Sequence, residues 1–212
     1  MAVLNSGLNW QPALRQRWQA GLPGLDAHER MVPPERRPHL RNGFPDNRKL
    51  SAVLVMLYQG EEGLCTPLIV RNAYNGVHSK QIAFPGGKLE PSDPGLLYTA
   101  LRETHEEVGY KAETSSVLGE LTRLYIPPSG FEVVPFLCVL DTLPQLYANP
   151  REVSEILYLP LHEVRKPEAF SELELQTSRG LEAVPAFIWQ QHTIWGATAM
   201  VLNELLELTA TL

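Results

Sequence analysis

The chain contains little cysteine and no long apolar run. Only two of its 212 residues are cysteines, Cys65 and Cys138, and both stand in apolar, strand-like surroundings. Two cysteines argue against a disulfide framework, so we expect reduced thiols and a cytoplasmic location. No apolar run approaches the roughly 18 residues of a membrane-spanning helix, and residues 1–11 lack the basic and apolar regions of a signal peptide. We therefore expect no membrane partner.

Basic charge is scarce over most of the sequence. The formal net charge is −6. Residues 1–50 hold eight Lys or Arg and four Asp or Glu, a balance of +4, so residues 51–212 carry −10. Because basic surface dominates affinity for duplex nucleic acid, this acidic body argues against a nucleic-acid partner. The arginines of the first 50 residues are candidates for contacts with a polyphosphate, and ordinary surface charge on an N-terminal helix and loop is the alternative.

The order of predicted elements indicates an α+β fold. Residues 1–48 are predicted to form an N-terminal helix and a Pro/Arg-rich extension, and residues 49–212 a single folded domain. Apolar alternation and turn signals predict strands near 50–58, 64–71, 81–84, 116–124, 131–140, 155–159, 184–187 and 191–194. Helical periodicity predicts helices near 9–20, 94–108 and 196–208, with a short one beginning near residue 162.

Three glutamates crowd the predicted helix at 94–108. At roughly 100° per residue, Glu103, Glu106 and Glu107 share one face. The opposite face carries the residues expected to pack on the core: Leu97, Leu101, Thr104 and Val108. Like charges at this spacing repel, whereas magnesium takes oxygen ligands and keeps substrate phosphates in its remaining positions. We therefore predict a metal platform for phosphate chemistry; the alternative is a solvated acidic helix face.

The residues that flank this helix favour the metal site. Gly86 and Gly87 follow an apolar run, and glycines allow the main chain to approach a ligand closely. Asp93 followed by Pro94 predicts the start of the helix, and Gly109 stands where a C-terminal glycine is expected. A strand end, a glycine loop, a capped helix and three carboxylates form a combination with few accidental matches.

The segment from Gly87 to Tyr110 resembles the signature of the Nudix hydrolases. That signature runs Gly, five residues, Glu, seven residues, Arg-Glu, an aliphatic residue, any residue, Glu-Glu, any residue, Gly and an aliphatic residue. Here Asp93 replaces the first glutamate and eight residues separate it from Arg102. Thr104 and Tyr110 stand at positions that are usually aliphatic. The longer spacer is similar to that of the branch containing coenzyme A pyrophosphatases.

The resemblance to that branch covers about residues 50–208. Upstream, Arg71 is followed seven residues later by His78, and then by the run Gln-Ile-Ala-Phe-Pro-Gly-Gly at 81–87. Similar stretches follow at 129–136, 185–187 and 194–199. Two positions depart from the pattern, because Lys80 replaces a common glycine and Ile69 replaces a threonine. These departures bear on the substrate and not on the type of reaction.

The resemblance implies a Nudix-type α/β/α sandwich around a mixed β-sheet and a metal-dependent hydrolysis of phosphoanhydrides. Glu103 and Glu107 are then expected to bind Mg²⁺ or Mn²⁺, with Glu106 taking a second ion or bridging. By the same analogy the main-chain carbonyl of Gly86 is a further ligand. Metal ions in such sites neutralise phosphate charge and lower the pKa of bound water.

The candidate catalytic residues are Glu106, Arg102 and Glu152. Arg102 is expected to pair with Glu90 or Asp93 and to hold the signature together. Glu152 is the preferred general base, since loop glutamates serve as base or extra metal ligand in some relatives. Glu132, on a strand near the signature helix, is the alternative.

Three basic residues are candidates for binding the substrate: Arg71, His78 and Lys80. The loop 125–130 is also a plausible substrate contact, because its prolines limit flexibility. The expected substrate is coenzyme A or an acyl derivative, cleaved to 3′,5′-ADP and a phosphopantetheine. Alternatives are ADP-ribose, NADH or a diadenosine polyphosphate, and a non-catalytic nucleotide-sensing module on the same fold. A homodimer is possible.

Overall fold

The computed structural model describes residues 10–72, 81–177 and 180–212. The candidate substrate residues His78 and Lys80 therefore lie outside the described residues. The described helices are α1 (Trp10–Ala20), α2 (Gly24–Glu29), α3 (Leu96–Val108), α4 (Leu161–Val164) and α5 (Gly196–Leu208), with short 3₁₀ helices at Pro34–Arg41, Thr114–Ser116 and Pro167–Ala169. The described strands are β1 (Lys49–Gly60), β2 (Gly63–Arg71), β3 (Ile82–Ala83), β4 (Gly86–Lys88), β5 (Val117–Glu120), β6 (Leu124–Ile126), β7 (Phe131–Leu140), β8 (Val153–Pro160), β9 (Phe170–Thr177), β10 (Gly180–Trp189) and β11 (His192–Trp195).

The larger sheet is mixed and is built around β1. Its order along the main path is β3-β2-β1-β7-β5, with β4 beside β1, β6 beside β7 and β8 beside β2. β1 and β7 run parallel, from Lys49 opposite Phe131 to Tyr58 opposite Leu140. β9, β10 and β11 form a separate antiparallel sheet. The predicted α+β fold with helices around a mixed sheet is confirmed.

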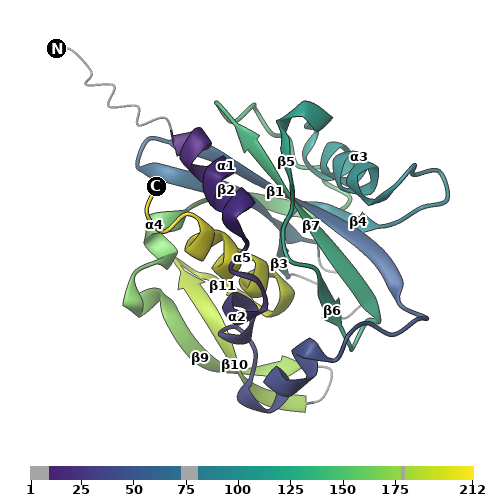
Figure 1. The fold of residues 1–212 in the computed structure, drawn as a ribbon, viewed down its shortest axis with the longest axis vertical. Coiled ribbons are helices and arrows are strands. Elements are labelled where there is room, and N and C mark those ends of the chain that lie inside the picture. The colour runs from purple at the N-terminus through teal and green to yellow at the C-terminus, as the bar shows by residue number, and fades with distance from the viewer. Residues whose placement is uncertain (1–9, 73–80, 178–179) are drawn as a thin grey trace.

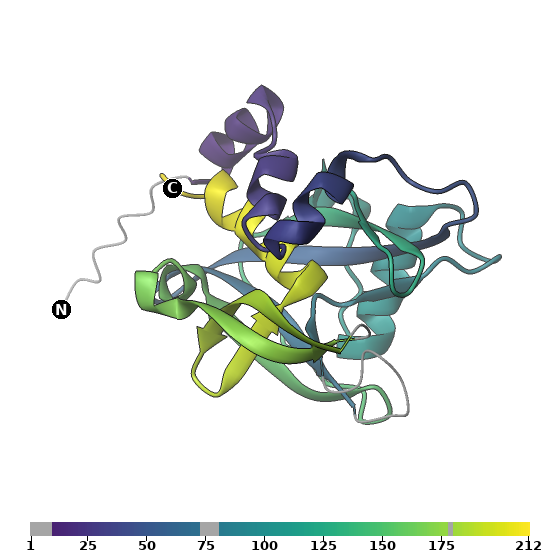
Figure 2. The same ribbon diagram turned by 90° about the horizontal axis from the view of Figure 1, so that it is seen from below.

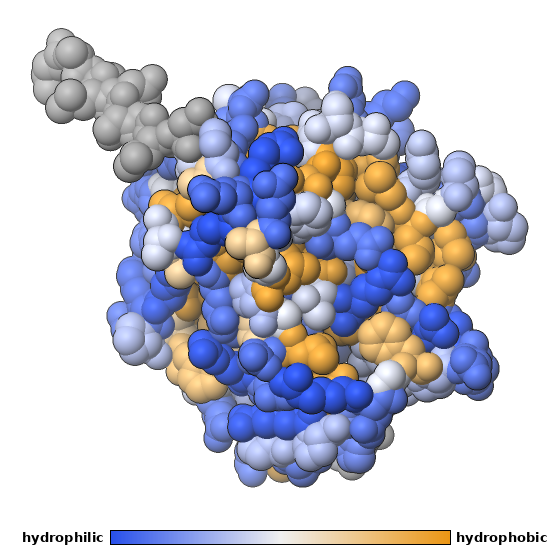
Figure 3. All heavy atoms as spheres, viewed as in Figure 1, coloured by the Kyte–Doolittle hydropathy of each residue, from blue (hydrophilic) through white to orange (hydrophobic). Residues whose placement is uncertain are grey.

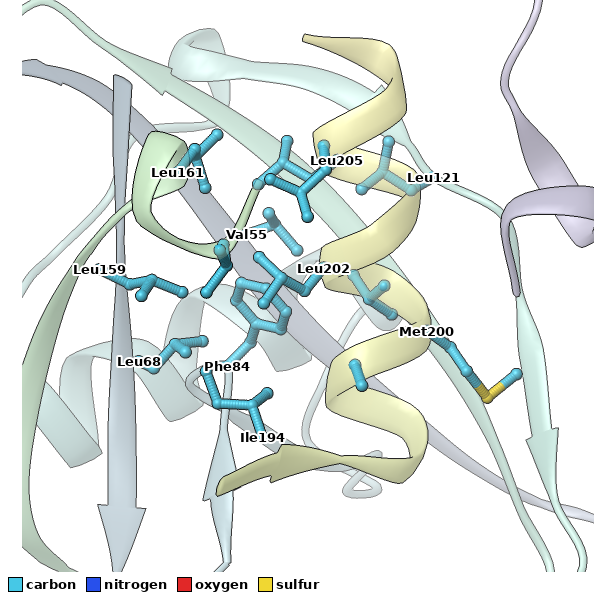
Figure 4. Close-up of a cluster of buried hydrophobic side chains, with 14 of the residues drawn as sticks. Val55, Leu68, Phe84, Leu121, Leu159, Leu161, Ile194, Met200, Leu202 and Leu205 are labelled. Atoms are coloured by element: carbon cyan, nitrogen blue, oxygen red, sulfur yellow. The ribbon is translucent and has the colours of Figure 1, made fainter. Parts of the chain in front are cut away.

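The alternation of β1 divides the interior into two cores. Successive strand residues point to opposite faces, so Val55 and Leu57 pack with α5 in one cluster, whereas Leu54 and Met56 pack with α3 in the other. Figure 4 shows the first cluster, with Val55 and Phe84 facing side chains from α5. The sheet thus lies between the two helices, and α3 is held over β4.

The N-terminal segment packs against the last helix. α1 and α2 lie beside α5 (Figures 1 and 2), and Leu14 and Met31 are buried in the same cluster as α5. His28 and Glu204 are both fully buried, with Nε2 and Oε2 3.1 Å apart. Residues 10–48 are thus anchored to the remainder, while the separation of residues 1–48 as an extension stays a prediction.

The structure adds elements that the sequence did not predict. α2 occupies part of the predicted connector, and β9 fills the stretch before β10. β9 alternates exposed and half-buried residues, with Glu172 and Glu174 exposed. This alternation is typical of a half-buried strand, although no strand was predicted at these residues. β4 has only three residues, two of them glycines. It is a strand because it pairs with β1.

Candidate active site

The glycine loop lets β4 lie tightly between β1 and α3. A Cβ on Gly86 would lie 2.3 Å from the carbonyl oxygen of Ala52, and the φ angle of Gly86 is +152°. A Cβ on Gly87 would lie 2.3 Å from the carboxyl carbon of Glu103. At Gly86 only glycine tolerates the contact, because the neighbouring atoms belong to the backbone, whereas a larger residue at position 87 would displace the Glu103 carboxylate. The two glycines therefore bring the main chain of β4 directly against the carboxylate face of α3.

The start of α3 differs from the prediction. Asp93 does not cap the helix: Gly95 is the N-cap residue, and no side chain caps it. Asp93 instead accepts hydrogen bonds from the main-chain N–H of Glu90 (3.0 Å) and from the Thr99 hydroxyl (2.9 Å). The end of the helix matches the prediction, because Gly109 is left-handed with φ 70° and its N–H donates to His105.

Arg102 joins the loop to the helix. Its Nε and Nη2 each donate to an oxygen of Asp93 at 2.9 Å, which is a bidentate pair. This pair holds the pKa of Asp93 well below its ordinary range. Arg102 Nη1 also donates to Glu103 (3.0 Å) and Glu106 (3.1 Å), and Nη2 donates to the carbonyl of Lys88 (3.2 Å). The predicted pairing of Arg102 with Asp93 is confirmed.

Glu107 is buried, which the prediction of an exposed carboxylate face did not foresee. Glu107 is 1% exposed, and its Oε2 accepts a hydrogen bond from Gly86 N–H at 2.8 Å. Its Oε1 lies 3.1 Å from Nη1 of Arg71. Burial raises the pKa of Glu107 to about 7, against the opposing effects of Arg71 and the Gly86 N–H.

Each of the three glutamates is paired with an arginine, and their role as metal ligands stays a prediction. Among the described residues, no three acidic, histidine or cysteine side chains come together around one point. Arg102 lies between Glu103 and Glu106, and Arg71 pairs with Glu107. Neighbouring carboxylates repel each other, and the positive charges of Arg71 and Arg102 offset this repulsion.

The oxygens beside Arg71 nevertheless fit a divalent cation. Arg71 Nη2 donates to the carbonyl of Gly86 at 2.7 Å, while its Nη1 pairs with Glu107 Oε1. One positive group thus contacts both oxygens that were predicted to bind metal. Glu107 Oε1 is buried and accepts no hydrogen bond from any described residue. Glu103, 14% exposed, lies over Gly87 beside them. Carboxylate and carbonyl oxygens are the ligands that Mg²⁺ and Mn²⁺ prefer.

A loop on the other side of Glu107 carries the candidate base. The N–H of Asn149 donates to the carbonyl of Glu107 at 2.9 Å, and Glu152 N–H donates to Asn149 at 3.0 Å. Glu152 is exposed, and its charge helps to raise the pKa of Glu107. The loop therefore keeps Glu152 near the carboxylates and open to water.

Glu132, the alternative base, lies in a different environment. It is 1% exposed and forms ion pairs with both Arg48 and Arg123. Its main-chain carbonyl accepts a hydrogen bond from Ser51 at 2.9 Å. A carboxylate held between two guanidinium groups is poorly placed to take a proton from water, so the geometry favours Glu152.

A cavity of about 1020 Å³ opens from the glycine loop. Among the described residues, four cations line it: Arg36, Arg71, Lys88 and Arg123. Three of them pair with carboxylates that lie outside the lining: Arg36 with Glu182, Arg71 with Glu107, and Arg123 with Glu120 and Glu132. Across the described part of the chain, no Asp or Glu lines it, although the whole protein carries −6. Such a cavity attracts anionic ligands. Figure 3 shows apolar side chains at the surface over the part of the sheet where β1, β4 and β7 run, bordered by hydrophilic residues.

Comparison with known proteins decides the family. A model of the NUDIX domain matches residues 48–177. The chain belongs to the Nudix family. It is 34% identical over 183 residues to the uncharacterized Nudix hydrolase NudL of Photorhabdus laumondii, which covers 84% of this chain and 90% of that protein. NudL of an Enterobacter species is also 34% identical, over 75% of this chain and 82% of that protein. A MutT/nudix family protein from Enterococcus faecalis has the same fold, with a TM-score of 0.52 at 16% identity over 86% of this chain and 71% of that chain.

Membership of the family fixes the type of chemistry. The protein is a Nudix hydrolase that acts on nucleoside diphosphate derivatives, and Nudix hydrolases generally use divalent metal ions. In the ranges 10–72, 81–177 and 180–212, no helix has the length and hydropathy to cross a membrane.

Sequence reasoning missed the contact between Arg71 and Glu107, and it missed Lys88 and Arg123 as cavity residues. The basic content of residues 1–50 was the one signal that pointed to Arg36.

Proposed function

We propose that this Nudix hydrolase cleaves the phosphoanhydride bond of coenzyme A or of an acyl derivative, giving 3′,5′-ADP and a phosphopantetheine. The main support is the cavity that opens beside Gly86 and Gly87, because its charged described lining residues are four cations. Three of these cations pair with carboxylates outside the lining and would have to reorient toward an anionic substrate. A pyrophosphate linked to further groups needs positive charge and room beyond the reacting bond. The resemblance of residues 68–87 to the coenzyme A branch favours this substrate over ADP-ribose, NADH and diadenosine polyphosphates.

The carboxylates of α3 are proposed to hold the divalent ion, Mg²⁺ or Mn²⁺. Glu103 and Glu107, with the carbonyl of Gly86, supply hard oxygen ligands, and Glu106 is available for a second ion because it is 48% exposed. When bound, such an ion neutralises phosphate charge and activates water. Arg71, which contacts two of these oxygens, is then free to move toward the substrate phosphates that line up along the cavity.

The protein's own residues perform the remaining work. Arg102 fixes Glu103 relative to the loop through its bidentate bond to Asp93. Glu152 is proposed to accept the proton of the attacking water. The water oxygen forms a bond to phosphorus, the bridging P–O bond breaks, and the leaving phosphate keeps the bonding electrons. Lys88 and Arg71 stabilise the charge that develops on the phosphate oxygens.

A substrate panel tests the proposal. The enzyme is incubated with Mg²⁺ or Mn²⁺ and with coenzyme A, octanoyl-coenzyme A, ADP-ribose, NADH and a diadenosine polyphosphate, and the products are identified by mass. We expect the highest kcat/KM for a coenzyme A derivative, with 3′,5′-ADP as one product. Preference for ADP-ribose by tenfold or more would reject coenzyme A as the substrate and keep the reaction type.

A further inference from the structure

The cavity wall contains residues that precede the family match. Residues 31–45 contribute much of the lining, including Met31, Val32, Leu40 and Phe44, whereas the NUDIX model begins at residue 48. These four side chains are apolar, in contrast to the cations beside the glycine loop. Arg36 and His39 of the same segment also line the cavity, but Arg36 pairs with Glu182. The N-terminal segment therefore adds an apolar surface to a cavity that has cations beside the glycine loop.

This wall is a fixed part of the molecule. Met31 and Val32 are 2% and 6% exposed and belong to the core that surrounds α5. The helix before them is anchored by the buried pair of His28 and Glu204. Thr122 donates its hydroxyl proton to the same carboxylate at 2.6 Å. A wall anchored by buried polar contacts can select ligands by shape, because it does not rearrange to accommodate a ligand that fits poorly.

The opposite wall is also apolar. It includes Ile126 at the end of β6, Pro127 in the loop that follows, Trp195 at the end of β11 and Met200 in the first half of α5. Phe44 joins the two sides, because its ring lies 6.4 Å from that of Tyr125 at 34°. An apolar moiety that enters between these walls loses contact with water, which is favourable in proportion to its buried area.

We propose that the segment 31–45 binds an aliphatic chain attached to the nucleoside diphosphate, and that Phe44 determines how strongly the enzyme prefers acylated over free substrate. This inference rests on the proposed function for the position of the pyrophosphate, at the glycine loop. The pantetheine arm extends from there along the cavity, and the acyl chain at its thiol end lies against the wall made by Leu40, Phe44 and Tyr125. The N-terminal segment thus sets specificity, while α3 provides the hydrolytic chemistry.

The test compares two ligands that differ only in an acyl chain, coenzyme A and octanoyl-coenzyme A. Their Kd values are measured by calorimetry with EDTA, which prevents turnover, and their kcat/KM values are measured with Mg²⁺. The variants are Phe44→Ala, Phe44→Leu and the control Phe170→Ala. Phe170 is also an aromatic residue with a ring partner at 6.4 Å, it is 46% exposed, and it does not line the cavity.

We expect the wild-type enzyme to bind octanoyl-coenzyme A about tenfold more tightly than coenzyme A. Phe44→Ala removes most of this ratio, Phe44→Leu retains most of it, and Phe170→Ala leaves it unchanged. A ratio near one in the wild type, or an unchanged ratio in Phe44→Ala, overturns the inference. A purely structural role for Phe44 would weaken both ligands equally and is rejected by a changed ratio. If binding shows the preference but neither ligand is hydrolysed, the proposed function fails and the wall stands.

Discussion

Replacing Glu107 with glutamine separates the chemistry of the site from its folding. The substitution keeps the size of the side chain and one side-chain oxygen. This oxygen can still accept the hydrogen bond that Gly86 N–H donates to Oε2 at 2.8 Å in the wild type. It removes the negative charge that faces Arg71 at 3.1 Å. Arg71 keeps its hydrogen bond to the Gly86 carbonyl and has a side chain 26% exposed, so water and that carbonyl partly replace the lost partner.

The expected effects on stability and on catalysis differ in size. Stranding a fully buried charge costs about 3–5 kcal/mol, but Arg71 is partly exposed and the buried carboxylate is itself removed. We therefore expect the free energy of unfolding at pH 7 to change by no more than about 2 kcal/mol. We expect kcat/KM with Mg²⁺ to fall by about 10²–10³, the range seen when one group that stabilises transition-state charge is lost.

The pKa of Glu107 adds a signature that depends on pH. Burial raises this pKa to about 7 from an ordinary value of 4.5, so the folded protein holds a proton that the unfolded chain releases. In a chelator, the wild-type free energy of unfolding should therefore fall as pH rises from about 4.5 to 7, by at most about 3 kcal/mol for this group. Glu107→Gln lacks that dependence.

The assay combines product formation, measured by mass, with thermal unfolding of the same samples. Glu113→Gln serves as a control, because Glu113 is an exposed glutamate five residues after α3. Wild-type turnover by Glu107→Gln at saturating Mg²⁺ would show that the Glu107 carboxylate is not needed for hydrolysis. A loss of activity that simply follows a large loss of stability would contradict the separation of catalysis from folding.

Three further predictions concern the same loop and helix. Asp93→Asn removes the bidentate pair with Arg102 and is expected to lower the free energy of unfolding by about 3 kcal/mol, which corresponds to a Tm lower by about 10 °C. Because the pKa of Asp93 is held below its ordinary range, the stability difference between wild type and variant should shrink as pH falls below about 4. An equal difference at pH 3 and pH 7 would contradict the pairing. Gly87→Ala places a methyl group 2.3 Å from the Glu103 carboxyl carbon, so kcat/KM should fall by about 10–100-fold in a protein that still unfolds cooperatively; unchanged kinetics at limiting Mg²⁺ would argue against Glu103 as a ligand. Mg²⁺ at about 100 times its Kd should raise the wild-type free energy of unfolding by about 2.7 kcal/mol over EDTA, and the same rise in Glu107→Gln would place the ion elsewhere.

The local sequence predicted those parts of the fold that local rules determine. The glycine stop of α3 follows from the need for a left-handed residue, and the continuous apolar run of β1 follows from burial on both faces. The pairing of Arg102 with Asp93 was accessible because both residues belong to one short motif.

Contacts between distant segments were not accessible in this way. The helical periodicity placed Glu107 on an outward face, but β4 covers that face because Gly86 and Gly87 carry no side chains. The contact of Arg71 with Glu107 depends on β2 and α3 meeting across β4. The role of residues 31–45 as a cavity wall depends on α2 docking on α5. Local sequence patterns do not predict such contacts between distant segments.

The most direct test of the central claim is the position of the catalytic ion. Crystals of the enzyme soaked in Mn²⁺ would be measured for anomalous scattering at the manganese edge. We expect a peak within coordinating distance of the carboxylates of Glu103 and Glu107 and of the Gly86 carbonyl, with Arg71 displaced from that carbonyl. A peak remote from all three groups, in crystals of an enzyme that hydrolyses its substrate with Mn²⁺, would contradict it.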